Sequence, residues 1–74
     1  MTASEARKKT EIALEKRAMK ELPSIELEIE ERANQGGEFL MLPEEISTEL
    51  KALLEKNGFS VEIRAGEGRT IIEW

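Results

Sequence analysis

Apolar residues in the first third of the chain recur every three or four positions between charged residues, a pattern that predicts a helix. Thr2 and Glu5 have the spacing of a capping box, in which the two side chains satisfy free N–H groups of the first turn. From Ala3 to Leu22 the chain contains no Gly, Pro or aromatic residue. We therefore expect a helix over about residues 3–22.

Pro23 interrupts this pattern, because it has no N–H and disfavours the helical conformation of the residue before it. Residues 24–31 alternate apolar and acidic positions as a strand would, yet their apolar residues also continue the helical spacing. Two interpretations are open: one long helix bent near Pro23 and ending near Asn34, or a separate strand over residues 25–30. We favour the bent helix, because Glu is a poor strand former.

The second half of the chain carries strand and helix patterns in turn. Residues 38–42 form a short apolar run that predicts a buried strand. Pro43 is suited to the first turn of a following helix. One apolar face and an Asn57-Gly58 stop support that helix. Residues 59–64 alternate, and after a glycine-rich turn residues 69–74 predict the last strand. In residues 59–64 the expected inward-facing side chains are Phe59, Val61 and Ile63.

These elements predict an α+β fold in a single domain over residues 1–74. A helical arm at residues 1–34 would precede a β-α-β-β core at residues 35–74 with a small three-stranded sheet. A right-handed crossover would place residues 38–42 parallel to residues 59–64, with the last strand between them or at the edge. A helix of some thirty residues is roughly 45 Å long, so part of it must extend beyond so small a core.

Composition excludes several classes of chemistry. The 74 residues include neither Cys nor His, which removes disulfides, thiolate and imidazole metal sites, and the Ser-His-Asp triad. All 16 acidic residues are Glu, at positions that the patterns above leave exposed, so we expect no enzyme, no metal and no cofactor. No apolar run approaches the ~20 residues that cross a bilayer, and no secretion signal follows Met1. We expect a cytoplasmic protein that does not engage a membrane.

The end of the chain carries two motifs, Leu-x4-Gly-aromatic-x-Val at residues 53–61 and Ile-x-Trp at residues 72–74. With the charged opening helix and the Asn/Gly-rich break before a strand, the chain resembles small uncharacterised accessory proteins of tailed bacteriophages and prophages. Pro23 departs from the uninterrupted first helix of that pattern. The resemblance implies a phage accessory protein in the cytoplasm of the host cell, and it carries no catalytic residues.

Self-association is the assembly that we expect. A core this small supplies only about 3–5 kcal/mol of stability, so a partner copy would complete it. The first 23 residues are net +2 (six basic, four acidic) and residues 24–74 are net −7 (five basic, twelve acidic), which favours an antiparallel arrangement of two first helices. The predicted oligomer interface is the helical stripe Ile12, Leu14, Ala18, Leu22, Ile25 and Ile29.

Five residues are candidates for binding a ligand or partner: Arg7, Lys8, Arg64, Arg69 and Trp74. We predict a non-enzymatic, homo-oligomeric phage accessory protein that binds and perturbs a host component. One alternative is a counter-defence sponge that sequesters an anionic nucleotide at a subunit interface. Another is a weak nucleic-acid binder using the basic first helix. Interleaved Glu residues and the lack of an aromatic residue favour a solvated helix face over nucleic-acid binding.

Overall fold

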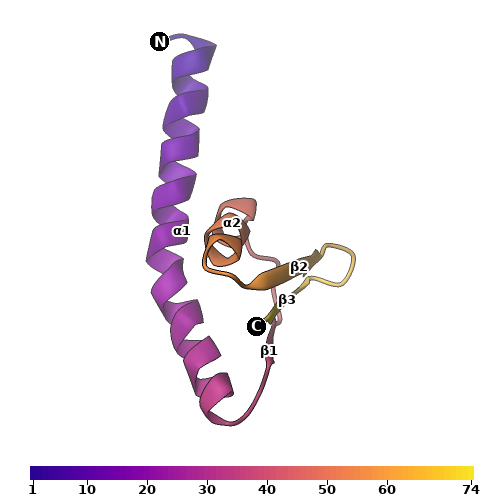
Figure 1. The fold of residues 1–74 in the computed structure, drawn as a ribbon. Helices are drawn as coiled ribbons and strands as arrows, with labels where there is room; N and C mark the ends of the chain where they lie inside the picture. Colours follow the sequence, from indigo (N-terminus) through magenta and orange to yellow (C-terminus); the bar gives the residue numbers. More distant parts are fainter.

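The computed structural model describes all 74 residues as a long helix, a short helix and a three-stranded sheet (Figure 1). This is the α+β fold that the sequence predicts. The elements in chain order are α1 (Ala3–Asn34), β1 (Phe39–Leu42), α2 (Thr48–Lys56), β2 (Ser60–Arg64) and β3 (Arg69–Glu73).

α1 is one helix of 32 residues with Pro23 inside it. It begins at the predicted cap, where the Thr2 side chain accepts a hydrogen bond from the Glu5 backbone N–H at 3.2 Å. The alternative of a strand over residues 25–30 is wrong. Ile25 and Ile29 are buried one helical turn apart, and their packing on the core holds this segment helical.

Pro23 lies on the exposed side of α1. Because it has no N–H, it leaves the Met19 carbonyl without its helical donor and lets the helix bend there. Figure 1 shows the helix curving around α2, with its convex side toward solvent. The bend therefore lets one continuous helix follow the core.

The start of α2 differs from the prediction. We expected this helix to begin at Pro43, but it begins at Thr48, with the Ser47 side chain accepting from the Leu50 N–H at 3.2 Å. The preceding segment is tied to the sheet instead. The buried Thr70 hydroxyl donates to the Glu44 carbonyl at 2.8 Å and accepts from the Ile46 N–H at 3.1 Å. These bonds hold residues 44–46 against β3, so the helix starts after them.

The strand order is β1-β3-β2, and both outer strands pair antiparallel with β3. β1 and β2 are therefore parallel to each other, as the right-handed crossover predicts. The prediction left the last strand either between them or at the edge, and β3 lies between them. Its inward side chains Thr70 and Ile72 are both fully buried. Because β3 is the central strand, these two side chains have a neighbouring strand on each side.

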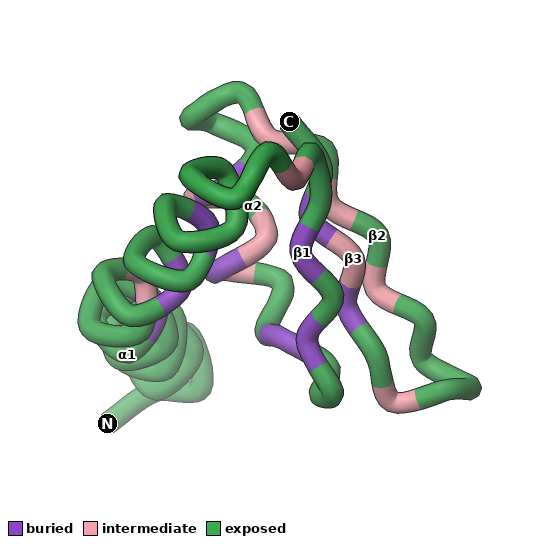
Figure 2. Tube along the Cα trace, turned by 90° about the horizontal axis from the view of Figure 1, so that it is seen from below, coloured by how far each residue is buried: buried purple, intermediate pink, exposed green.

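Both helices lie on one face of the sheet (Figures 1 and 2). α1 packs beside α2 and against β1, and α2 packs against β2. The buried segments face one another between the helices and the sheet in Figure 2. The apolar core between them consists of Ala18, Ile25, Ile29, Leu40, Leu42, Ile46, Leu50, Leu54 and Ile72.

The N-terminal half of α1 extends beyond this core. The molecule measures 51 Å along its longest axis but only 17 Å along its shortest. Ala18 is the first buried residue of α1. Figure 1 shows the preceding turns rising past α2, which confirms that part of this helix overhangs.

Candidate functional site

The predicted oligomer interface is divided by the structure. Ala18, Ile25 and Ile29 are buried in the core of their own chain, which leaves them little surface for contact with a second copy. Leu22 is half-buried and packs against the same core. These residues pack against the sheet and α2, so the chain itself covers this apolar face of α1. Ile12 and Leu14 remain exposed, by 46% and 36%.

A second apolar surface on α1 shares only Ile12 with the predicted stripe. Met19 and Leu27 are 59% and 57% exposed, Ile12 is exposed on the same side, and Pro23 lies between them. We call Ile12, Met19, Pro23 and Leu27 the outer stripe. The sequence contained this signal, because the residues follow at steps of seven, four and four, close to whole numbers of helical turns. The stronger core-facing stripe obscured it.

The face of the sheet away from the helices is uncovered. Phe39 and Met41 alternate with the buried Leu40 and Leu42, and they are 57% and 49% exposed. Ile71 lies beside Met41 in the strand register and is half-buried. An antiparallel sheet with one wet face normally carries polar residues there. We call Phe39, Met41 and Ile71 the outer sheet patch.

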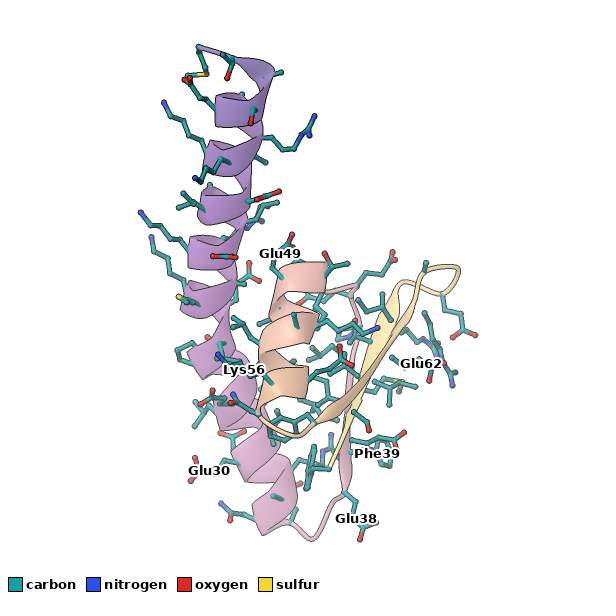
Figure 3. All side chains as sticks on the ribbon, turned by 45° about the horizontal axis from the view of Figure 1, so that its top comes forward. Glu30, Glu38, Phe39, Glu49, Lys56 and Glu62 are labelled. Carbon is teal, nitrogen blue, oxygen red and sulfur yellow. The ribbon has the colours of Figure 1, made fainter.

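Figure 3 shows Phe39 and Glu62 on the side of the sheet that faces away from α2. In the hairpin of β2 and β3, the Arg64 Nε atom lies 3.4 Å from the Glu62 carboxylate, and the Arg64 Nη1 atom lies 3.5 Å from the Glu67 carboxylate. The hydrogen bond and charge of Glu62, with a smaller contribution from Glu67, raise the pKa of the Arg64 guanidinium above its ordinary value. The Arg64 charge is thus compensated within the hairpin.

The five predicted binding residues do not come together. Arg7 and Lys8 lie in the overhanging part of α1, whereas Arg64 and Arg69 face each other across β2 and β3. Trp74 follows β3 at the opposite end from that pair. Its ring packs edge-on against Phe59, with 6.3 Å between ring centroids, and it is 39% exposed. The residues form separate basic positions and an aromatic pair, so no single anion site includes them.

A groove of ≈ 820 Å³ runs between α1 and the connection from β1 to α2. Its charged lining contains two cations, Arg17 and Lys20. Its carboxylates are more numerous: Glu21, Glu28, Glu44 and Glu45. Arg17 is already paired with Glu21 at 3.4 Å. The groove is therefore electrostatically unsuited to an anionic nucleotide.

A smaller hollow of ≈ 350 Å³ lies on another side of the contact between α1 and α2. Met19, Ala52 and Leu53 give it an apolar floor, and Glu49 and Lys56 border it. Figure 3 shows Glu49 and Lys56 at opposite ends of α2. Because Met19 belongs to both surfaces, the hollow continues the outer stripe onto α2.

No cluster of three or more acidic side chains is arranged to hold a metal ion. Neither helix combines the length and the apolar character needed to span a bilayer. No protein-family model matches the chain, and no curated protein or solved structure is significantly similar to it.

Proposed function

We propose that this protein is a non-enzymatic, homo-oligomeric binding protein whose outer sheet patch binds a partner protein. The observation that carries the proposal is the exposure of Phe39 and Met41 on a face that nothing in the chain covers. Aromatic residues and Met are enriched where proteins bind one another. Glu62, Arg64 and Glu73 would form the polar border that such interfaces commonly have.

The resemblance of the chain to phage accessory proteins supports a host protein as the partner. Binding of that protein would perturb its activity by covering one of its surfaces. The sponge alternative has less support, because Arg64 is compensated by two carboxylates and the large groove is mainly acidic. The basic part of α1 also carries interleaved Glu residues, as expected for a solvated helix rather than a nucleic-acid surface.

The test compares three tagged chains in a bacterial cytoplasmic extract: the unmodified chain, a Phe39→Ser plus Met41→Lys variant, and a Glu55→Gln control at an exposed position of α2. Both substituted sites in the double variant are exposed, so its helicity and melting temperature should stay close to those of the unmodified chain. We expect the unmodified chain and the control to retain the same polypeptide in comparable amounts, and the double variant to lose it.

The retained polypeptide is then purified and titrated against all three chains by calorimetry. Loss of binding in the folded double variant alone would support the outer sheet patch as the binding surface. Equal binding by all three chains would contradict the proposal, and so would failure of the unmodified chain to retain any polypeptide.

A further inference from the structure

We infer that two copies of the chain associate through their outer stripes, with the two α1 helices antiparallel and Met19 beside the two-fold axis. The inference rests on the self-association proposed above and names the surface responsible for it. The second copy is the occupant because one helix carries both halves of a self-complementary surface, as an interface between identical copies requires.

The outer stripe is free for this contact. At about 100° of rotation per residue, it lies about a third of the way around the helix from Ala18, Ile25 and Ile29. A partner helix on this side would therefore not meet the sheet or the core of the first copy. The apolar floor formed with Ala52 and Leu53 widens the contact beyond the helix itself.

Charges flanking the outer stripe favour one direction and one register for the α1 helix of the second copy. Lys8 and Lys9 precede it, and Glu30 and Glu31 follow it. All four are exposed, and none forms an ion pair within the chain. An antiparallel pair that sets Lys9 opposite Glu30 also sets Lys8 opposite Glu31. A parallel pair would instead place like charges together, which is unfavourable.

The same register aligns the apolar residues. With Lys9 opposite Glu30, Ile12 lies opposite Leu27 of the second copy, and the two Met19 side chains meet near the axis. Exposed ion pairs contribute little free energy, so they choose the arrangement rather than drive it. Removal of Ile12, Met19 and Leu27 from water supplies the driving force.

The absence of cysteine from the chain allows a direct test by disulfide formation. Met19→Cys should crosslink two copies under mild oxidation, because residues beside the axis come within the 4.4–6.8 Å that a disulfide spans between Cα atoms. Ile12→Cys alone should not crosslink, since the two copies of this residue would lie about 22 Å apart along the helices. Ile12→Cys combined with Leu27→Cys should crosslink again.

A charge exchange tests the register independently. Lys8→Glu plus Lys9→Glu should raise the dissociation constant of the dimer about tenfold, because attraction at both ends becomes repulsion. Adding Glu30→Lys and Glu31→Lys should restore it. An unchanged dissociation constant in the first variant, or no restoration in the second, would overturn the proposed register.

The light-scattering mass of the unmodified chain separates the two levels of the proposal. A dimer mass together with no disulfide at position 19 would overturn the contact through the outer stripe and leave self-association intact. A monomer mass at high concentration would overturn self-association and this inference together. Circular dichroism of each variant confirms that the tested chains are folded.

Discussion

Thr70 provides the sharpest test of how the core is held together. Its hydroxyl donates to the Glu44 carbonyl and accepts from the Ile46 N–H, and its side chain is fully buried in the central strand. Thr70→Val keeps the shape and the branched side chain of the strand residue but removes the hydroxyl. Two backbone groups of the connection between β1 and α2 would then lose their partners.

The expected loss is large for so small a domain. Each unsatisfied buried group costs about 1–3 kcal/mol, and partial rehydration of the Glu44 carbonyl reduces the sum, so we expect a loss of about 2–4 kcal/mol. One kcal/mol corresponds to roughly 4–8 °C in a domain of this size, which gives a fall of at least about 8 °C in melting temperature. Thermal denaturation followed by circular dichroism measures it.

Thr70→Ser is the matched control. It keeps both hydrogen bonds and removes one buried methyl group, which costs about 1 kcal/mol. The valine variant should therefore be clearly less stable than the serine variant. A valine variant as stable as the serine variant would refute the hydrogen-bond argument and show that methyl packing decides this position.

Three further substitutions test the helix, the sheet register and a turn. Pro23→Ala should raise the melting temperature and add up to about 3 kcal/mol to the free energy of unfolding, because it restores a helical hydrogen bond. Reduced helicity by circular dichroism would contradict this. Val61→Asp should unfold the domain by placing a charge against the core, whereas Glu62→Lys on the outer face should be mild; equal melting temperatures would contradict the register. Gly58→Ala should cost about 1 kcal/mol in urea unfolding because φ is +93° there, and Gly66→Ala, with open space around it, should be near neutral.

Local patterns predicted most of the fold because each depends on residues close in sequence. The Thr2 cap, the Asn57-Gly58 stop and the alternation of residues 59–64 all recur in the structure. The start of α2 could not be found in this way. It depends on Thr70, which is 24 residues from Ile46 along the chain and bonds to it only in the folded state.

The candidate interface shows a different limit of sequence analysis. Periodicity identified an apolar stripe on the first helix, but it could not say whether the chain or a second copy would cover it. The core of the same chain takes Ala18, Ile25 and Ile29. The surface left for a partner contains Met19 and Leu27, whose periodic spacing is a weaker signal than that of the core-facing stripe. The exposure of these two residues in the folded chain reveals it.

Self-association is the central claim, and light scattering after size-exclusion chromatography tests it most directly. At tens to hundreds of micromolar, the unmodified chain should give twice the 8.4 kDa mass of one chain. Met19→Glu plus Leu27→Glu should give the mass of one chain, and Thr10→Glu, away from the outer stripe, should remain a dimer. A mass of 8.4 kDa for the unmodified chain at the highest concentration would contradict the account.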